Sequence, residues 1–225
     1  MKEKNTVSQT FMVLVAVYIT CLLLSNLIAG KMWAVTASVT LPAAVILFPI
    51  TYIFGDVFTE VYGFRKARTV IWMGFACSLF AVLVYMLTVA LPHPDYWTNQ
   101  DAFAAVLGTT PRVAAASFIG YLFGEFSNAV ILSKLKVATN GSRLWVRSIL
   151  STLVGEGFDS IIFIMVSFYG TMPTASLWRM VLFQYLFKVS YEVLCTPLLY
   201  WAVNRLKKSE GNDTFDVGEK YFAKG

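Results

Sequence analysis

The chain has 225 residues, of which 57% are hydrophobic and 14% are charged, with a formal net charge of +5 at pH 7. Soluble domains carry about 25% charged residues, so this composition excludes an ordinary soluble domain and predicts a single membrane domain. The cysteines Cys21, Cys77 and Cys195 lie in apolar runs without metal-ligand spacing. We therefore predict no disulfide framework, no metal site and no cofactor.

Six apolar segments are long enough, at roughly 20 residues, to span a bilayer. They cover residues 9–30, 41–62, 69–91, 113–135, 150–169 and 177–204. The first segment lacks a small-x-small cleavage site, so we expect a retained anchor. The fold class that follows is an all-α membrane protein with six transmembrane helices in residues 1–208. Residues 92–111 form the longest external loop, and residues 209–225 form a polar cytoplasmic tail that we expect to be mobile.

The lysines and arginines indicate the orientation of these spans. If the N-terminus is inside, the outer side holds only Lys31, Arg112 and Arg179. The cytoplasmic side then holds fourteen basic residues: Lys2, Lys4, Arg65, Lys66, Arg68, Lys134, Lys136, Arg143, Arg147, Arg205, Lys207, Lys208, Lys220 and Lys224. Both termini are predicted to be cytoplasmic. The basic balance is thus explained by topology, and no nucleic-acid partner is predicted.

Three spans of equal direction contain a similar short motif. Tyr52-Ile-Phe-Gly-Asp56 in the second span is echoed by Tyr121-Leu-Phe-Gly-Glu125 in the fourth and, more faintly, by Tyr185-Leu-Phe-Lys188 in the sixth. This pattern favours a three-hairpin internal repeat, as in many transporter folds. Chance similarity between apolar sequences is the alternative.

Acidic residues enter the predicted spans, beginning with Asp56 and Glu60 in FPITYIFGDVFTEVYGFRKAR. Their spacing of four residues would place both on one face of a helix. Ionisable groups at such depth are tolerated when they face a protein interior or a wet cavity. The other polar residues at this depth are Asn26, Glu125, Asn128, Glu156, Asp159, Gln184, Lys188 and Glu192, the last two at the spacing of a helical ion pair.

Six acids and one lysine in the spans cannot all remain ionised and unpaired in a low-dielectric core. Hydrogen bonds that fix helix packing are the alternative interpretation. Their number, spread over four spans, instead favours a polar cavity. The neighbouring glycines, Gly55, Gly124, Gly155 and Gly157, indicate close helix packing, with local unwinding as the functional alternative.

A cavity rich in acceptors selects a cation or a ligand with many N–H donors. One carboxylate can accept both N–H groups of a guanine-like edge, while Asn128 or Gln184 serves the neighbouring carbonyl. An inward-facing aromatic ring would stack on a flat heterocycle. The candidate substrate-binding residues are Asp56, Asp159, Glu125, Asn128, Glu156, Lys188, Tyr52, Glu60, Gln184 and Asn26.

The sequence resembles the queuosine-precursor transporter family, formerly labelled a vitamin-uptake transporter family, over roughly residues 11–206. The resemblance lies in FPITYIFGDVFTEVYGFRKARTVIW, ASFIGYLFGEFSNAVILSKLK, LWVRSILSTLVGEGFDSIIF and QYLFKVSYEVLCTPLLY. It implies a six-span bacterial inner-membrane importer of 7-deazaguanine bases, such as 7-cyano-7-deazaguanine or its aminomethyl relative. The positions that fit the family pattern are Asp56, Arg68, Asn128, Arg147, Gly155, Asp159 and Lys188. Glu60, Glu125 and Glu156 stand where relatives can carry an amide or a base.

Three classes of function follow. The first is a secondary importer whose surplus buried carboxylates exchange protons. The second is a substrate-binding module of an ATP-driven vitamin-type uptake system, although Ala16 and Thr20 do not complete the expected docking face. The third, an intramembrane aspartyl protease using Asp56 and Asp159, is disfavoured because Phe54-Gly55-Asp56 lacks the first glycine of the usual motif. We predict no enzyme activity. The sequence does not specify an oligomeric state and leaves a homodimer open.

Overall fold

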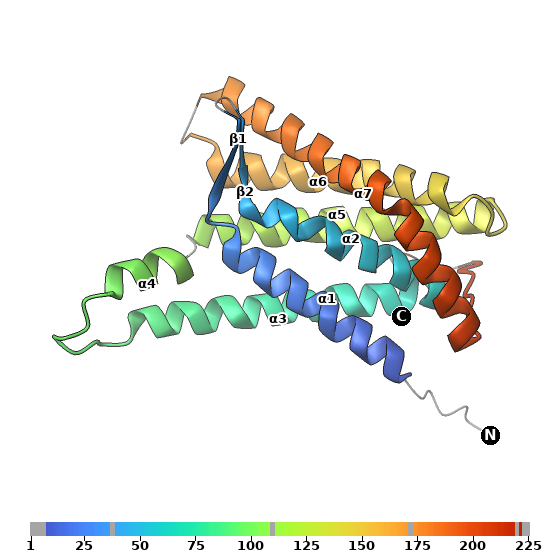
Figure 1. Ribbon diagram of the computed structural model, residues 1–225, viewed down its shortest axis with the longest axis horizontal. Coiled ribbons are helices and arrows are strands. Elements are labelled where there is room, and N and C mark those ends of the chain that lie inside the picture. Colours follow the sequence, from blue (N-terminus) through green and yellow to red (C-terminus); the bar gives the residue numbers. More distant parts are fainter. Residues whose placement is uncertain (1–7, 37–38, 109–110, 171–172, 219–220, 222–225) are drawn as a thin grey trace.

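The computed structural model describes residues 8–36, 39–108, 111–170, 173–218 and 221. In these ranges the chain forms a bundle of helices with a small β-hairpin at one end (Figure 1). The elements in order are α1 (Gln9–Ile28), β1 (Met32–Thr36), β2 (Val39–Pro42), η1 (Ala43–Ile46), α2 (Phe48–Val57), η2 (Phe58–Tyr62), α3 (Phe64–Ala90), α4 (Gln100–Leu107), α5 (Pro111–Ala138), α6 (Leu144–Phe168) and α7 (Thr174–Glu210). The antiparallel hairpin pairs Met32 with Pro42 and is an addition to the predicted all-α architecture.

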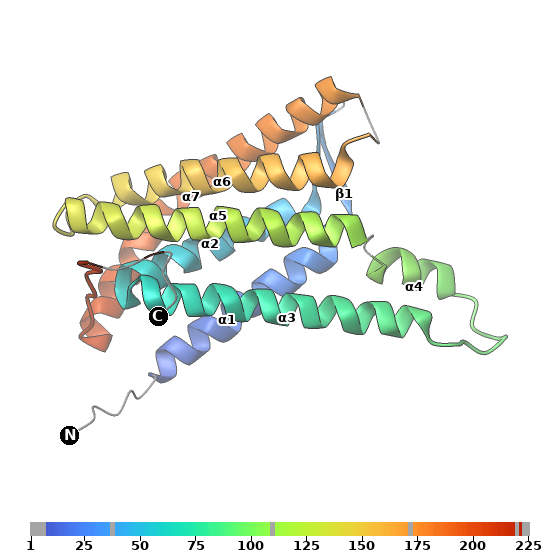
Figure 2. The same ribbon diagram turned by 180° about the vertical axis from the view of Figure 1, so that it is seen from behind.

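The connections between the long helices lie at two ends of the bundle (Figures 1 and 2). We call one the N/C end, because it holds the start of α1 and the end of α7, together with the loop between α5 and α6. The opposite end, the hairpin end, holds β1 and β2, the end of α3 and the start of α7. A solute that crosses the bundle along its long axis therefore travels from one of these ends to the other.

In the part of the chain that the structure describes, five helical segments are long and apolar enough to cross a membrane. They are Gln9–Ile28, Ala43–Tyr62, Phe64–Ala90, Ala115–Ala138 and Leu144–Phe168. These segments confirm the first five predicted spans, although two of them begin earlier than expected. Helix α7 has 37 residues but is not among the five. Its role as a sixth span stays a prediction, as does the three-hairpin repeat.

Basic residues of the described chain gather at the N/C end. They are Arg65, Lys66, Arg68, Lys134, Lys136, Arg143, Arg147, Arg205, Lys207 and Lys208, while the hairpin end has Lys31, Arg112 and Arg179. Lys2, Lys4, Lys220 and Lys224 lie outside the described residues. The separation is the one that the positive-inside rule requires of a cytoplasmic N/C end. The cytoplasmic location of both termini stays a prediction.

The second span is divided into three helical pieces. A 3-10 turn precedes α2, and a π-helix, η2, follows it from Phe58 to Tyr62. Gly63, with φ of 84°, then ends the segment before α3. Pi-helical turns are frequent at functional sites. Here the wider turn begins between Asp56 and Glu60, and the two carboxylates have different partners.

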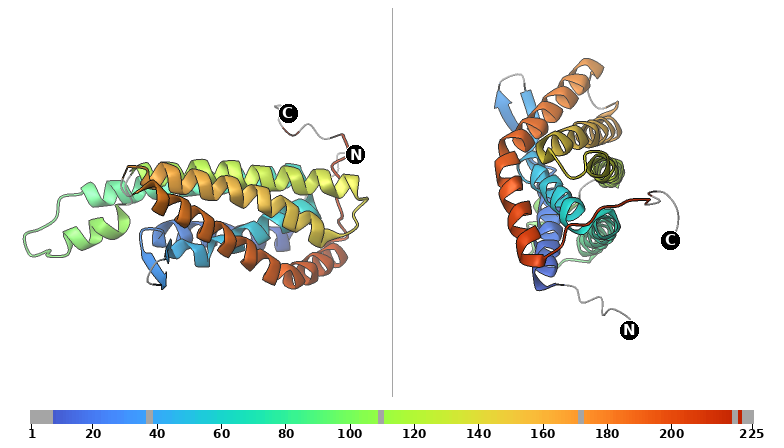
Figure 3. Two further views of the ribbon diagram at one scale, coloured as in Figure 1. Left: turned by 90° about the horizontal axis from the view of Figure 1, so that it is seen from above. Right: turned by 90° about the vertical axis from the view of Figure 1, so that its right-hand side faces the viewer.

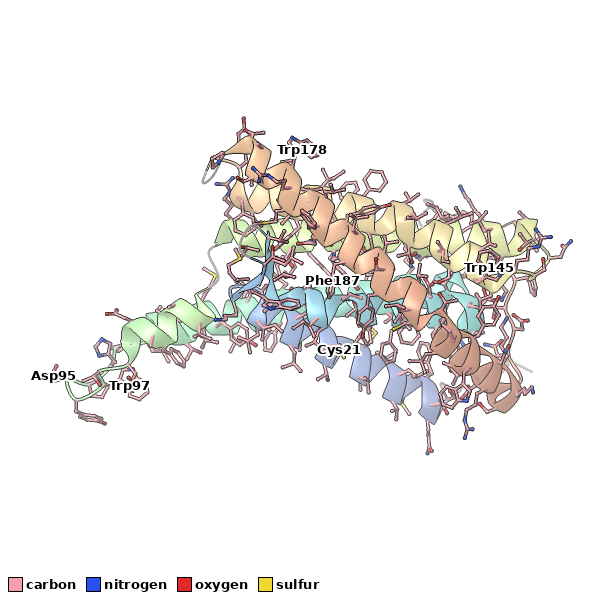
Figure 4. The ribbon with its side chains drawn as sticks, turned by 45° about the horizontal axis from the view of Figure 1, so that its top comes forward. Cys21, Asp95, Trp97, Trp145, Trp178 and Phe187 are labelled. Carbon is pink, nitrogen blue, oxygen red and sulfur yellow. The ribbon has the colours of Figure 1, made fainter. Side chains whose placement is uncertain are left out.

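The connection between α3 and α5 contains a helix that the sequence did not predict. Helix α4 occupies Gln100–Leu107 within the expected external loop. Figure 4 shows Asp95 and Trp97 at the tip of this connection, away from the rest of the bundle. Gln100 Nε2 donates a hydrogen bond of 2.9 Å to the carbonyl of Val89 and so ties α4 to the end of α3.

Helices α5 and α6 lie side by side along their lengths (Figures 1, 2 and 3). A Cβ on Gly124 would lie 2.9 Å from the carbonyl oxygen of Gly155, and a Cβ on Gly155 would lie 2.8 Å from that of Gly124. Only residues without side chains allow the two backbones to approach this closely. The close-packing interpretation is therefore confirmed for these two glycines.

The outer surface of the bundle carries many large apolar side chains. Phe80, Leu87 and Leu194 are 69%, 64% and 79% exposed. Buried side chains, by contrast, include the aromatic rings of Tyr18 and Phe58, packed edge to face at 5.7 Å. Contiguous exposed apolar surface is typical of a face that meets hydrocarbon.

Residues 211–218 are docked on the N/C end. Asp213 pairs with Lys136 and Lys207, and Asp216 accepts hydrogen bonds from the backbone of Phe64 and from Ser133. This segment of the predicted tail thus contacts the bundle, and its mobility stays a prediction. The sequence pattern showed its polarity but not the groups that it binds.

Gly124→Ala is expected to destabilise the protein. Its methyl group would lie 2.2 Å from Tyr52 Oη and 2.9 Å from the Gly155 carbonyl, so the cost is about 1–3 kcal/mol of overpacking. Gly157→Ala is the matched control, because its nearest neighbour would be Tyr185 Cε2 at 3.8 Å. Thermal unfolding in detergent measures both variants. Equal stability of the two would contradict the tight α5–α6 contact.

Candidate functional site

Lys188 on α7 is the centre of a buried charged group. Its Nζ lies 2.7 Å from Glu156 Oε2 and also donates a hydrogen bond to Asp159 Oδ2. Both acids are on α6, and all three residues are at most 3% exposed. The expected helical ion pair between Lys188 and Glu192 is wrong, because the ammonium group reaches across to α6 instead. One positive charge thus serves two carboxylates.

A cavity at the hairpin end borders this charged group. Its volume is about 30 Å³. A volume of that size holds roughly two waters. Its polar lining is Asn26, Ser117, Asp159, Gln184 and Lys188, and Phe163 supplies an aromatic wall.

Two amides in this lining have different environments. Asn26 donates to Ser78 at 3.3 Å and accepts from Ser117 at 2.9 Å, so its orientation is fixed. Gln184 is 2% exposed, and its Oε1 has no hydrogen-bond partner among the described residues. An acceptor in that state is available to a ligand N–H group.

The end of the β-hairpin borders the cavity. Pro42 at the end of β2 lines the cavity, and Trp33 on β1 packs edge to face on Phe187 of α7 with ring centroids 6.1 Å apart. Figure 4 shows Phe187 where α7 passes the hairpin. Displacement of the hairpin or of α7 would enlarge the cavity.

Asp56 lies beyond the cavity, toward the N/C end, and its carboxylate contacts two side-chain hydrogen-bond donors. Asn128 Nδ2 donates to Asp56 Oδ1 at 2.8 Å, and Ser148 Oγ lies 2.5 Å from Asp56 Oδ2. Ser148 Oγ is also 3.0 Å from Glu192 Oε1. A serine has one hydroxyl proton, so it can donate to only one of the two carboxyl groups. A proton on Glu192, donated to Ser148, satisfies the whole chain.

Glu125 is a fully buried carboxyl group on α5. Neither of its oxygens has a hydrogen bond in the described part of the chain, and the residue is 0% exposed. Its Oε1 occupies the place of the missing Cβ of Gly55, 1.8 Å from where that atom would be. Because Gly55 has no side chain, α2 leaves room for the Glu125 carboxyl group of α5.

Glu60 lies in a separate basic cluster at the N/C end. Its carboxylate is 3.0 Å from Arg147 Nη1 and 2.7 Å from Lys207 Nζ, and its carbonyl accepts from Lys136 Nζ at 2.6 Å. Glu60, Lys136 and Arg147 are at most 1% exposed. We call Glu60, Lys136, Arg147 and Lys207 the charged plug.

The ten candidate residues are thus distributed over three levels. Asn26, Asp159, Gln184 and Lys188 line the cavity. Asp56, Glu125, Asn128, Glu156 and Tyr52 are buried next to it toward the N/C end, and Glu60 belongs to the charged plug. The sequence reasoning missed Ser148, although Ser148, Thr152 and Glu156 share one face of α6 at four-residue spacing.

Comparisons with known proteins identify the family. Residues 42–202 match the family model described as "Putative vitamin uptake transporter". The chain belongs to this family. No solved structure matches it.

Curated relatives carry more specific names. The chain is 29% identical over 157 residues to the "Probable queuosine precursor transporter" of Bacillus subtilis, covering 69% of this chain and 68% of the relative. It is 26% identical over 165 residues to the "Queuosine precursor transporter" of Escherichia coli, covering 72% of each. The family and the apolar helices establish a multi-pass bacterial membrane protein.

Lys188→Met is expected to destabilise the protein by about 3–5 kcal/mol at neutral pH, because it leaves Glu156 and Asp159 without their cation. Because those carboxyls must then be protonated, the loss should be smaller at pH 5 than at pH 8. Thermal unfolding in detergent at both pH values measures the effect. The control is the triple variant with Glu156→Gln and Asp159→Asn, which should recover much of the loss. A triple variant as unstable as the single one would contradict the ion-pair assignment.

Proposed function

We propose that this chain is a secondary transporter that imports queuosine precursors, the 7-deazaguanine bases 7-cyano-7-deazaguanine or its aminomethyl relative, across the bacterial inner membrane. Family membership and the names of the relatives support the substrate class. The observation that carries the proposal in this chain is the cavity that ends on the Asp159–Lys188 pair inside an apolar bundle.

The chemistry of the cavity suits a flat heterocycle with N–H donors. Asp159 would accept two neighbouring N–H groups of the base, and Gln184 Oε1 offers a further acceptor. Phe163 offers a face on which the ring can stack. Lys188 would keep its second partner, Glu156, when the substrate takes Asp159.

The remaining candidates would act after the base has entered. Asp56 and Asn128 form a second acceptor-rich level next to the cavity, toward the N/C end. Because the volume of the cavity is only about 30 Å³, the base enters only when the hairpin or α7 moves away. With the N/C end in the cytoplasm, this cavity faces the outside, as an importer requires.

The proposal includes coupling of substrate uptake to proton movement. Apart from Glu60 of the charged plug, five carboxyl groups are buried in the bundle: Asp56, Glu125, Glu156, Asp159 and Glu192. Lys188 compensates one charge, and Asp56 has hydrogen-bond donors. Glu125 has neither, so it carries a proton in this state, because an unpaired buried charge is far more costly. A carboxyl group that holds a proton next to the substrate level can release it when the path opens to the cytoplasm.

Asp56→Ala and Asp159→Ala are each expected to abolish substrate recognition. The assay is queuosine recovery in tRNA of precursor-fed cells that lack both synthesis and native uptake. Asp95→Ala makes the same chemical change at an exposed position in the external connection and should leave recovery intact. Full recovery by the two site variants at equal membrane abundance would show that the site is wrong. Failure of the unaltered chain to restore queuosine would refute the function itself.

Glu125→Gln is expected to uncouple uptake from the proton gradient. In liposomes containing only this protein, acid outside should accelerate uptake by the unaltered chain, since protonation occurs on that side. The variant should still equilibrate substrate but show no acceleration, because an amide cannot exchange the proton. Glu210→Gln, at the end of α7, is the matched control. Acceleration that persists in Glu125→Gln would assign coupling to another group.

A further inference from the structure

The charged plug closes the bundle opposite to the cavity. Glu60 on η2 contacts Lys136 of α5, Arg147 of α6 and Lys207 of α7, so four elements meet on one carboxylate. Arg147 also donates to the carbonyl of Gly141 at 3.1 Å, within the loop between α5 and α6. A solute leaving the level of Asp56 toward the N/C end meets this plug.

Residues 211–218, which we call the strap, lie over the plug. Asp213 Oδ1 is 2.5 Å from Lys136 Nζ and 3.0 Å from Lys207 Nζ. Lys136 Nζ also donates to the Thr214 carbonyl at 2.7 Å. Lys136 and Lys207 therefore contact both Glu60 and the strap, and the strap bridges α5 to α7.

A second part of the strap binds the start of α3. Asp216 accepts from the backbone N–H of Phe64 at 3.0 Å and from Ser133 Oγ of α5 at 2.6 Å. A carboxylate at the first turn of a helix is stabilised by the free N–H groups and the helix dipole. Asp216 thus ties α3 to α5, while Asp213 ties α5 to α7.

Two glycines make room for the strap. Gly63 has φ of 84°, and a Cβ there would lie 2.6 Å from Thr214 Cγ2. Gly141 has φ of 76°, and its Cβ would lie 2.9 Å from Phe215 Cζ. The Phe215 ring also lies 4.6 Å from Lys136 Nζ. The surface of the N/C end is therefore shaped to the strap in backbone conformation as well as in charge.

We propose that the strap is the latch of an inner gate formed by the charged plug. While Asp213 and Asp216 are bound, α3, α5 and α7 cannot separate, and the path from Asp56 to the cytoplasm stays closed. Release of the strap allows α7 to carry Lys207 away from Glu60 and opens the path. This inference rests on the proposed function, since a gate acts only where a solute passes.

The latch responds to ionic contacts rather than to cytoplasmic pH. Burial would raise the pKa of Asp213, but hydrogen bonds and charge from Lys136 and Lys207 lower it below its ordinary value. A group with a lowered pKa keeps its contribution at all pH values above its ordinary range and loses it only in stronger acid. Asp213 therefore stays ionised, and the latch stays charged, throughout the neutral range.

The test measures access to the path without any substrate. A reporter cysteine replaces Thr152, which is 1% exposed and lies between Ser148 and Glu156 on the same face of α6. Cys21, Cys77 and Cys195 are first replaced by alanine. A membrane-impermeant maleimide is then added to inside-out and right-side-out membrane vesicles that contain the full-length chain.

Asp213→Ala combined with Asp216→Ala should raise the labelling rate in inside-out vesicles roughly tenfold or more, since each lost hydrogen bond involves a charged group. The milder Asp213→Asn should give a smaller rise in the same direction and serves if the double variant does not fold. Val217→Ala is the control within the strap, because Val217 is 77% exposed. It should label like the parent.

The outcomes separate the latch from the transport function. An unchanged labelling rate in both aspartate variants overturns the latch, even if the parent restores queuosine. A rise that appears in right-side-out vesicles also overturns it, because the gate would face the wrong side. A rise in inside-out vesicles supports the latch, even if queuosine recovery shows that the substrate assignment is wrong.

Discussion

Buried charge has to be compensated throughout this bundle. A charged group surrounded by apolar helices must be paired, hydrogen-bonded or neutralised by a proton. Lys188 pairs with two carboxylates of α6, Asp56 contacts two hydrogen-bond donors, and Glu125 has no hydrogen-bond partner among the described residues. Because these solutions need groups from different helices, the polar side chains face the interior and hold the helices in register.

Different kinds of interaction close the two ends of the bundle. At the hairpin end, closure comes from a short β-hairpin and aromatic contact over a small cavity. At the N/C end it comes from ion pairs around Glu60 and from the strap. Exchange of a buried ion pair for hydrated charges is close to balanced in free energy, because desolvation offsets most of the attraction. Such contacts can break and re-form repeatedly, which suits a gate.

Glycines allow the helices that carry the buried polar groups to approach one another closely. Gly124 and Gly155 let α5 and α6 approach until their backbones touch, and Gly55 leaves the space that the Glu125 carboxyl occupies. The close approach strengthens every electrostatic interaction among these groups, because it lowers the local dielectric constant. The glycines therefore allow the close helix contacts in which the acids are buried, although the two patterns are separate along the chain.

The sequence alone was enough to predict six apolar spans, five of which coincide with helices long and apolar enough to cross a membrane. It also predicted the basic residues at one end and the acids at depth, because hydropathy and charge are local properties. It also placed Gly124 and Gly155 at a close helix contact. The packing of the helices was needed to see that Lys188 pairs with α6 rather than with Glu192, that a π-turn separates the partners of Asp56 from those of Glu60, and that residues 211–218 dock on the N/C end. Those outcomes depend on which helices are neighbours and how they are rotated, and no spacing within one helix contains that information.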